Sequence, residues 1–307
     1  MQKTESTEKS PTYSTKRKLL FIVNPNAGKK ISEKLINTIK KEFPKAIYYQ
    51  IVVWKDKDHF QEVLDIIKSQ DYTDVIAVGG DGTVNQVAKS IINTNIALGI
   101  VPAGSGNGLA RTLGLSMKVE EVIKQLANGN KSVIDYGEVN NIPFFCTSGI
   151  GFDAHIGNLF ATSVKRGLSS YVKITVRELM RYRSKNYTLQ INGQEIKRKA
   201  YLITVANAGQ YGNDFYIAPQ AKLNDGIFHV VILKPFGLFG AIGILIKVLK
   251  GKANESKYIE TYTASSLSIQ REESGPIHFD GEPEMQGESL NYICHPSALN
   301  VIVGKSL

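Results

Sequence analysis

The 307-residue sequence contains only two cysteines, Cys146 and Cys294, and no CxxC pair. Neither a zinc site nor a disulfide scaffold is therefore indicated. Both cysteines lie in apolar stretches, so buried free thiols are the simpler expectation. The five histidines lack the spacing of metal ligands, and residues 1–16 lack the apolar segment of a secretory signal. We expect a cytoplasmic globular protein whose histidines are ordinary packing or surface residues.

Long hydrophobic runs are also scarce. Residues 230–249 are the strongest candidate for a membrane span, but Lys234, Pro235 and Lys247 interrupt them. The run between the two lysines is too short to cross a bilayer. We predict a strand that ends near Leu233, then an apolar helix from about 238 to 249. This helix either packs into the core or offers an apolar surface for docking on lipid.

Positive charge is in surplus, with 37 lysines and arginines against 28 acidic residues and a formal net charge of +9. Such a surplus suits an anionic partner: a nucleotide, an acidic membrane surface or a nucleic acid. No nucleic-acid recognition motif accompanies it, so we expect no nucleic-acid partner. The basic stretch 165–183 is either a solvated helix face or a surface attracted to anionic lipid.

The first half of the chain alternates between strand and helix patterns. We predict a disordered polar arm at 1–16. The short apolar runs that follow are typical of buried strands, and the segments between them carry apolar residues at helical spacing. This alternation predicts a parallel sheet with helices on both faces. We assign residues 17–135 to this α/β domain, with strands near 18–25, 47–54, 74–80 and 96–102 and helices near 31–43, 59–69 and 84–92.

The pattern changes after about Val133. Short runs rich in β-branched and aromatic residues follow, separated by the turn pairs Asn192-Gly193, Asp225-Gly226 and Asp280-Gly281. We predict a β-rich second domain over 136–295, with inserted helices at about 165–183 and 238–250. The segment 298–304 is typical of a last strand. Residues 296–307 could belong to the second domain or rejoin the first, and the sequence does not decide between the two.

One glycine-rich loop stands out, Val78-Gly79-Gly80-Asp81-Gly82-Thr83, between a buried strand and a helix. Such a turn aims backbone N–H groups and the positive helix end at one spot, which suits phosphate. Asp81 would repel phosphate unless a cation lies between them, so we expect Mg²⁺ there. An ordinary tight turn is the alternative.

Two similar loops follow other strands, at 24–28 and 102–108. Ligands of open parallel sheets bind at the carboxyl ends of the strands, so the three loops are expected to converge. None of them fits the pattern GxxxxGK[ST] or GxGxxG, which excludes ordinary P-loop and Rossmann sites.

The motifs NPNAGK, VGGDGTVNQV and PAGSGNGLAR, in that order, resemble the catalytic domain of the diacylglycerol and sphingosine kinase family. The stretches GIGFDAHI, ANAGQYGNDFYIAPQAKLNDGIFHV and HFDGEP are similar to the second domain of that family. The resemblance runs from about Lys18 to Val303. It implies an α/β nucleotide-binding domain like that of NAD kinase and diacylglycerol kinase, a β-sandwich that carries the lipid, and a cleft between them. It also implies ATP, Mg²⁺ and a lipid hydroxyl as acceptor.

The resemblance also implies roles for individual residues. Asp280 matches the catalytic carboxylate, Glu282 lies close by, and Asp81 would coordinate the catalytic Mg²⁺. A second, structural Mg²⁺ would lie at Asp225, helped by main-chain oxygens near Lys222 and Ile227. The nucleotide would contact residues of all three loops: Asn24, Asn26, Gly28, Gly79, Gly80, Asp81, Gly82, Thr83, Asn85, Ser105 and Asn107.

The lipid itself stays open. Asn107-Gly108 in the third loop is more similar to sphingosine kinases, whereas GFDA at 151–154 is similar to the diacylglycerol kinases. We predict a diacylglycerol kinase that forms phosphatidic acid in phospholipid synthesis and associates peripherally with a membrane. A sphingoid-base or other lipid kinase, an NAD kinase-like enzyme and a catalytically silent lipid-binding protein are the alternatives. Homodimer formation is left open.

Overall fold

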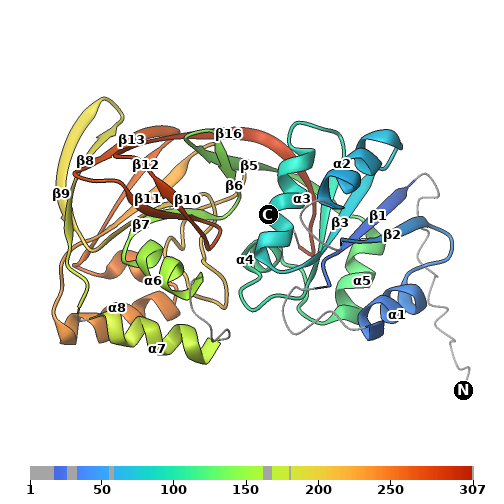
Figure 1. Cartoon of the computed structure of the whole chain (residues 1–307), viewed down its shortest axis with the longest axis horizontal. Coiled ribbons are helices and arrows are strands. Elements are labelled where there is room, and N and C mark those ends of the chain that lie inside the picture. Colours follow the sequence, from blue (N-terminus) through green and yellow to red (C-terminus); the bar gives the residue numbers. More distant parts are fainter. Residues whose placement is uncertain (1–16, 26–32, 55–58, 162–167, 180, 306–307) are drawn as a thin grey trace, which may run out of the picture.

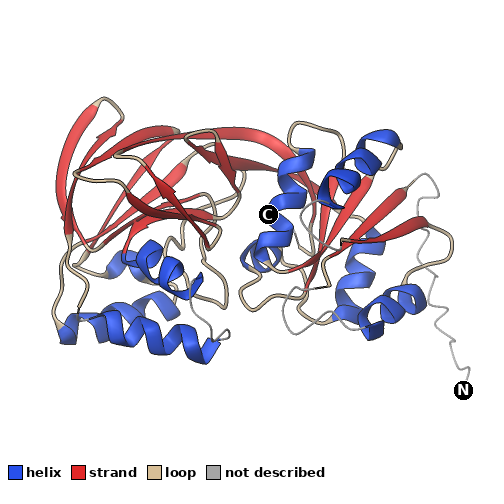
Figure 2. Cartoon of the chain, viewed as in Figure 1, coloured by secondary structure: helices blue, strands red, loops and turns tan. Residues whose placement is uncertain are grey.

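A computed structural model describes residues 17–25, 33–54, 59–161, 168–179 and 181–305. The predicted arm 1–16, Asn26 and Gly28 lie outside these ranges. Figures 1 and 2 show two β-rich units side by side, with one long strand running across both. The helices are α1 (Glu33–Glu42), α2 (His59–Ser69), α3 (Asp81–Ile91), α4 (Gly108–Thr112), α5 (Val119–Asn128), α6 (Phe152–Ala161), α7 (Leu168–Leu179) and α8 (Leu238–Leu249).

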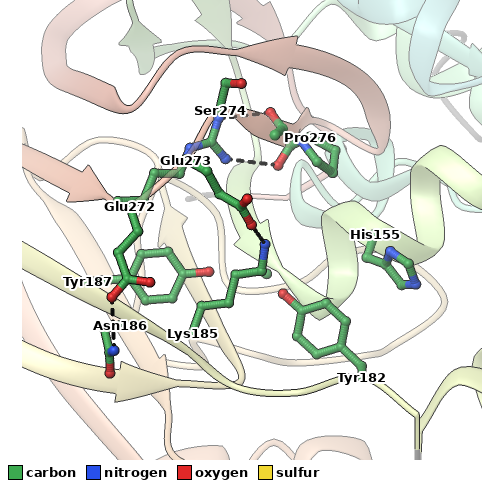
Figure 3. Close-up of a pocket in the computed structure, with 12 residues that line it drawn as sticks. His155, Tyr182, Lys185, Asn186, Tyr187, Glu272, Glu273, Ser274 and Pro276 are labelled. Carbon is green, nitrogen blue, oxygen red and sulfur yellow. Dashed lines mark hydrogen bonds and ion pairs between the residues drawn. The ribbon is translucent and has the colours of Figure 1, made fainter.

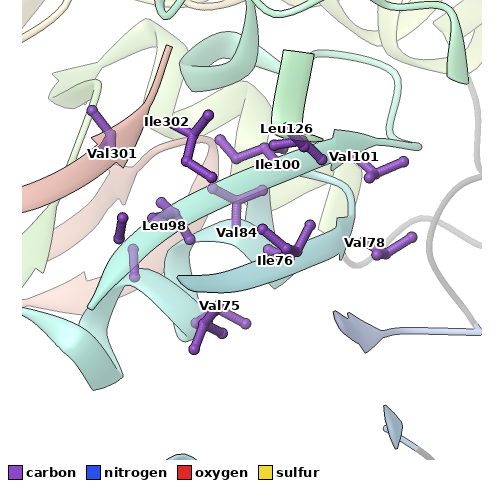
Figure 4. Packing of buried hydrophobic residues seen from close by; sticks show 14 of the residues in the cluster. Val75, Ile76, Val78, Val84, Leu98, Ile100, Val101, Leu126, Val301 and Ile302 are labelled. Carbon is purple, nitrogen blue, oxygen red and sulfur yellow. The ribbon is translucent and has the colours of Figure 1, made fainter. Parts of the chain in front are cut away.

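The first unit is built on parallel strands in the order β2-β1-β3-β4. Their bounds are β1 (Lys18–Val23), β2 (Tyr48–Val53), β3 (Asp74–Gly79) and β4 (Ala97–Pro102). Every residue of β3 and β4 is buried, as expected for parallel strands covered on both faces. Figure 4 shows how Ile76, Ile100 and Leu126 of α5 pack together in this core.

The second unit contains a six-stranded sheet in the order β12-β11-β10-β7-β14-β15. Its strands are β7 (Thr147–Gly151), β10 (Leu202–Ala206), β11 (Phe228–Leu233), β12 (Ile259–Ala264), β14 (Gly275–Phe279) and β15 (Glu282–Gln286). The pairs between neighbours are antiparallel. Apolar side chains such as Phe144, Ile203 and Leu290 fill the space between this sheet and the second, ten-stranded sheet. The predicted fold class, an α/β domain followed by a β-sandwich, is confirmed.

The last strand, β16 (Ser289–Ile302), connects the two units (Figure 1). Its first half pairs with β13 (Ser266–Arg271). On its other side β13 pairs with β8 (Lys185–Ile191), which in turn pairs with β9 (Gln194–Ala200). After an irregularity between His295 and Leu299, the end of β16 pairs in parallel with β4. The strand also pairs along its length with β5 (Lys131–Val139), whose other partner is β6 (Ile142–Phe144). The chain end therefore belongs to the sheet of the first unit, while the predicted boundary at 135/136 stays a prediction.

Two predicted turns take the expected conformation. Asn192 and Gly193 have φ of 51° and 76°, and Asp280 and Gly281 have φ of 50° and 89°. These left-handed pairs are typical of type I′ hairpins, which match the twist of the flanking strands. In contrast, the sequence analysis missed three helices, α4, α5 and α6.

Helices α6, α7 and α8 cover the outer face of the six-stranded sheet (Figure 2). They share one apolar cluster with that sheet, which includes Ile156 of α6, Ile174 of α7 and Val248 of α8. Of the helices in the described ranges, none is both long and apolar enough to cross a membrane.

Candidate functional site

The second and third predicted loops touch backbone to backbone at the carboxyl ends of β3 and β4. A Cβ atom placed on Gly104 would lie 2.6 Å from Gly80 Cα, and one placed on Gly80 would lie 3.2 Å from Gly104 Cα. Side chains at these positions would push the loops apart, because the neighbouring atoms belong to backbone. The glycines therefore allow the two strand-end loops to lie in direct backbone contact.

Asp81 joins the same two loops through its carboxylate. Its Oδ2 accepts the N–H of Asn107 at 2.9 Å, and its Oδ1 accepts the N–H of Gly108 at 2.8 Å. Asn107 has φ of 53°, and its side-chain amide bonds both the N–H and the carbonyl of Gly104. Asp81 thus fixes the start of α4 while it opens α3, and each of its oxygens keeps a further acceptor position.

The first loop meets the second through Asn24, which directly follows β1. Its Nδ2 donates to Thr83 Oγ1 at 3.0 Å, and its N–H donates to the Val78 carbonyl at 3.1 Å. The Thr83 side chain also fills the space beside Gly79, where an added Cβ would lie 2.5 Å from Thr83 Cβ. Ser105 lies exposed at the tip of the third loop. All three predicted loops are brought together, as far as their residues are described.

Asp280 brings the second unit to this junction. It lies in the hairpin between β14 and β15, and its Oδ2 accepts Asn85 Nδ2 of α3 at 2.7 Å. Three main-chain N–H groups also donate to the carboxylate, from Phe145 at 2.9 Å, Cys146 at 2.7 Å and Thr147 at 3.1 Å. Residues 195 positions apart therefore make a direct contact between the units. The four donors hold the carboxylate in one orientation.

Glu282 lies against the glycine-rich loop itself. A Cβ on Gly82 would lie 2.7 Å from Glu282 Oε1. Lys89 lies one helical turn after Asn85. Burial lowers the pKa of Lys89, and the nearby charges of Asp280, Glu284 and Glu282 act in the opposite direction. The sequence analysis missed Lys89, whose only signal was its spacing of four from Asn85 on α3.

The carboxylates influence each other across the junction. Burial raises the pKa of Asp81, and the charge of Asp280 raises it further, while the N–H groups of Gly108 and Asn107 act in the opposite direction. Burial also raises the pKa of the Cys146 thiol well above its usual value, with added contributions from Asp280 and Asp81. A cation between the two carboxylates would relieve the repulsion that raises the pKa of Asp81.

A second contact between the units involves residues 211–214. A Cβ on Gly212 would lie 2.9 Å from the Gly106 carbonyl oxygen, and Arg111 Nη1 lies 3.5 Å from Asp214 Oδ2. The third loop is therefore held between Asp81 on one side and the second unit on the other. No sequence pattern in residues 211–214 indicates that they lie at this junction.

A buried polar cluster lies next to Asp280 on the sandwich side. Asp153 Oδ2 accepts the Tyr211 hydroxyl at 2.9 Å and lies 3.1 Å from His278 Nε2. Thr204 Oγ1 bonds the same Tyr211 hydroxyl. His278 was expected to be an ordinary packing residue, and no local sequence pattern reveals that it meets Asp153. Its Nδ1 is buried and makes no hydrogen bond within the described structure.

The predicted structural metal site lies on a separate turn before β11. Asp225 is exposed, and its Oδ1 accepts the N–H of Ile227 at 3.3 Å. Asp135 Oδ2 accepts the N–H of Gly226 in the same turn at 2.7 Å. Within the described ranges no group of three or more His, Cys, Asp or Glu side chains could hold a metal. A Mg²⁺ here would rely on one carboxylate, main-chain oxygens near Lys222 and Ile227, and water.

A polar pocket occupies the opposite end of β14 from Asp280 (Figure 3). It lies near Gly275, and the ion pair Lys185–Glu273, at 2.5 Å, crosses its wall. Burial raises the pKa of Tyr182 in its lining to about 12. None of the predicted site residues lines this pocket, so it is separate from the loop junction.

The comparisons with known proteins agree with this two-unit geometry. The diacylglycerol kinase catalytic domain matches residues 18–139, and the YegS C-terminal NAD kinase beta sandwich-like domain matches residues 147–303. The chain belongs to the diacylglycerol kinase and YegS lipid kinase family. The resemblance predicted from the loop motifs is therefore confirmed, and the chain is a kinase, an ATP-dependent phosphotransferase.

Relatives within this lipid kinase family cover most of the chain. The diacylglycerol kinase of Bacillus subtilis (strain 168) is 26% identical over 288 residues, covering 90% of this chain and 93% of the relative. The probable lipid kinase YegS of Escherichia coli O1:K1 is 30% identical over 260 residues, covering 81% and 83%. A solved structure of a diacylglycerol kinase from Bacillus anthracis str. Sterne superposes with a TM-score of 0.69 at 20% identity, covering 94% of this chain and 97% of that one. This last likeness concerns the fold.

Proposed function

We propose that this lipid kinase transfers the γ-phosphate of ATP to the free hydroxyl of diacylglycerol, giving phosphatidic acid. The contact between Asn85 and Asp280 is the main observation in support, because it sets a carboxylate of the sandwich against helix α3, which the glycine-rich loop of the first unit opens. The names of the relatives and the GFDA stretch at 151–154 favour diacylglycerol over a sphingoid base.

The three loops are proposed to bind the ATP phosphates. The second loop leads into the N-terminus of α3, which has no side-chain cap and where the helix dipole favours anions. Thr83 and Asn24 join the first two loops, and the short contact between Gly80 and Gly104 joins the second and third. Phosphoryl transfer depends mainly on such positioning and on charge neutralisation.

Mg²⁺ suits this junction, because Asp81 and Glu282 supply oxygen atoms beside the loop and the two carboxylates Asp81 and Asp280 repel each other. When bound with ATP, the ion would offset the charge that develops on the transferred phosphoryl group. Asp81 is the proposed protein contact to the ion, through the acceptor positions that its bonds to Asn107 and Gly108 leave.

Asp280 is proposed to accept the proton of the lipid hydroxyl. Its carboxylate already accepts four donors, of which Asn85 Nδ2 is the side chain and the other three are backbone groups. Backbone donors cannot turn away, so the Asn85 bond is the one that must open to admit the hydroxyl. Until the hydroxyl arrives, the same bond holds the carboxylate toward α3, and in this way Asn85 would act as a positioning residue for the base.

The proposal includes peripheral association with a membrane on its cytoplasmic side, where ATP is available. Diacylglycerol is a bilayer lipid, so the enzyme must approach a membrane surface to reach it.

A labelling experiment tests the reaction. The purified chain would be incubated with Mg²⁺, γ-labelled ATP and separate samples of diacylglycerol, monoacylglycerol, ceramide, sphingoid base and NAD. We expect label in phosphatidic acid. Label in the sphingoid base or ceramide would change the substrate but keep the reaction, label in NAD would favour an NAD kinase-like enzyme, and no label in any acceptor would favour a silent lipid-binding protein.

A further inference from the structure

The apolar helix α8 shows its hydrophobic side chains to solvent. Phe239 is 89% exposed, and four aliphatic residues follow it along the helix with exposed fractions near one half: Ile242 at 55%, Leu245 at 47%, Ile246 at 47% and Leu249 at 53%. Their spacing of three and four places them on one side of the helix. We call these five residues the α8 stripe.

The opposite side of α8 is fixed in the protein. Ile244 is 8% exposed and Val248 is 1% exposed, and both pack in the cluster that α6 and the six-stranded sheet share. Figure 1 shows α8 at the outer edge of the second unit, far from the first unit. The packed face prevents the helix from rotating, so the stripe cannot turn inward to bury itself.

A surface helix of a soluble protein normally carries polar and charged residues on its solvent side. Single exposed apolar residues are common, whereas a continuous apolar surface marks an interaction site. The only charged residue of α8 is Lys247. It lies beside the buried face, and its Nζ donates to the Glu255 carbonyl. The stripe itself therefore contains no charged side chain that would favour contact with water.

Basic residues flank the stripe in the sequence. Residues 234–258 contain five lysines and a single acidic residue, Glu255. Lys250 directly follows the helix and is exposed, and Lys252 pairs with Glu255 at 3.2 Å in the next turn. Lysine side chains can lie along an apolar surface while their ammonium groups reach anionic headgroups. An apolar stripe flanked by lysines is typical of a helix that lies in a membrane interface.

A second copy of the chain fits the stripe less well. A 12-residue helix is about 18 Å long, so one side of it covers roughly 200 Å², far below the ~800 Å² that each partner of a stable complex usually buries. The small area favours a bilayer, which the stripe can enter without a complementary protein surface, and an anionic bilayer also carries the charge opposite to that of the lysines.

We infer that α8 is the membrane-docking element of this enzyme: the stripe enters the headgroup boundary of an anionic phospholipid bilayer, with the helix parallel to the surface and its lysines at the phosphates. This inference rests on the proposed function, because a kinase for a bilayer lipid needs such a surface. It goes further in assigning the contact to α8 and in choosing anionic lipid.

Vesicle sedimentation without ATP tests the assignment. Wild-type chain would be mixed with vesicles of phosphatidylcholine and phosphatidylglycerol at 4:1, and with pure phosphatidylcholine vesicles. Ile246→Gln is compared with Ile293→Gln on β16, because these isoleucines are 47% and 46% exposed on different surfaces. The double variant Phe239→Gln/Ile246→Gln extends the series, and its thermal midpoint and sedimentation velocity show whether the fold and the oligomeric state change.

We expect the wild type and Ile293→Gln to bind anionic vesicles equally, Ile246→Gln several-fold more weakly, and the double variant at least tenfold more weakly. Binding to pure phosphatidylcholine should be weaker throughout. Equal binding by all variants, or a dimer that only the double variant loses while vesicle binding persists, would overturn the inference. Because vesicle binding is measured without ATP, it is independent of the labelling experiment. Vesicle binding through α8 together with no labelled lipid in that experiment would refute the proposed reaction but keep the docking surface, and labelled lipid with no loss of vesicle binding in the α8 variants would do the opposite.

Discussion

At the residue scale, the buried charges of this chain divide into those that stabilise the fold and those at the loop junction. Asp74 at the start of β3 is fully buried and accepts Arg17 Nε at 3.0 Å and Thr73 Oγ1 at 2.6 Å, while Lys131 lies 2.9 Å away. It lies at the end of β3 opposite the loops. We therefore expect its network to act on stability alone.

Arg17→Met tests this division. The change leaves a buried carboxylate with a weaker set of partners, so the free energy of unfolding should fall by about 2–4 kcal/mol. Urea denaturation with an unchanged m value would measure it. Lys185→Met is the control, because it removes an ion pair with Glu273 whose side chains are 49% and 68% exposed and should change stability by less than about 1 kcal/mol. Equal losses in the two variants would contradict the assignment.

Asn85 should affect catalysis more than stability. Asn85→Ala removes the side-chain donor that orients Asp280, which we expect to lower kcat by about ten- to hundredfold. Unfolding free energy should fall by only about 1–2 kcal/mol. The matched change is Asn186→Ala, since Asn186 also donates to a carboxylate, Glu272, at 3.0 Å but lies away from the junction. Turnover in Asn85→Ala equal to that of the control would remove Asn85 from the positioning role.

At the scale of elements, the loops depend on contacts that only glycine allows. Gly104→Ala places a Cβ 2.6 Å from Gly80 Cα, so the two loops must separate. We expect ATP affinity to fall by about tenfold, equivalent to ~1.4 kcal/mol, in a calorimetric titration. Gly243→Ala in α8 meets no atom within 4 Å and should leave ATP affinity unchanged while raising stability by about 0.5–1 kcal/mol. Similar ATP affinities in both variants would count against the loop assignment.

An ion pair joins the two sheets of the second unit, and we expect its contribution to the free energy of unfolding to depend on pH. Glu260 of β12 accepts Arg198 Nε of β9 at 2.8 Å and lies 3.2 Å from Lys234 Nζ. The hydrogen bond from Arg198, followed by that from Lys234, lowers the pKa of Glu260, while burial opposes them. A lowered carboxyl pKa stabilises the fold above the unfolded pKa, and this contribution is lost as the pH falls through the folded value.

Glu260→Gln should therefore lower the unfolding free energy at pH 7 by less than about 1 kcal/mol, since both partners are partly exposed. The difference from the wild type should shrink as the pH falls below the usual pKa of glutamate and vanish in strong acid. Urea titrations at several pH values would measure it. A difference that stays constant with pH would show that packing, not charge, is responsible.

The elements themselves could be predicted to different degrees. The strands β1, β3 and β4 were predicted because buried parallel strands form short, continuous apolar runs. Helix α6 was missed because it starts at Phe152, directly after Gly151, the last residue of the buried strand β7, with no turn residue between the two elements. Helix α5 has its apolar residues at helical spacing, so the sequence does contain the pattern that predicts this helix.

At the scale of the whole molecule, the site is formed by parts that are far apart in the sequence. The loop motifs indicated three of its components, and the resemblance indicated Asp280. The contact of Asp280 with Asn85, and that of His278 with Asp153 across 125 positions, follow from the packing of the two units and have no local signal. The return of β16 to the sheet of the first unit helps to fix this packing, because β16 pairs with β13 in one unit and β4 in the other.

Turnover of Asp280→Asn with diacylglycerol, beside its affinity for Mg·ATP, tests most directly whether the two units form one catalytic centre. The exposed neighbour Glu284→Gln serves as the control. We predict that Asp280→Asn lowers kcat by about 10²–10⁴-fold, while ATP affinity stays close to that of the wild type. Near-normal turnover of Asp280→Asn would contradict the role of Asp280 as proton acceptor.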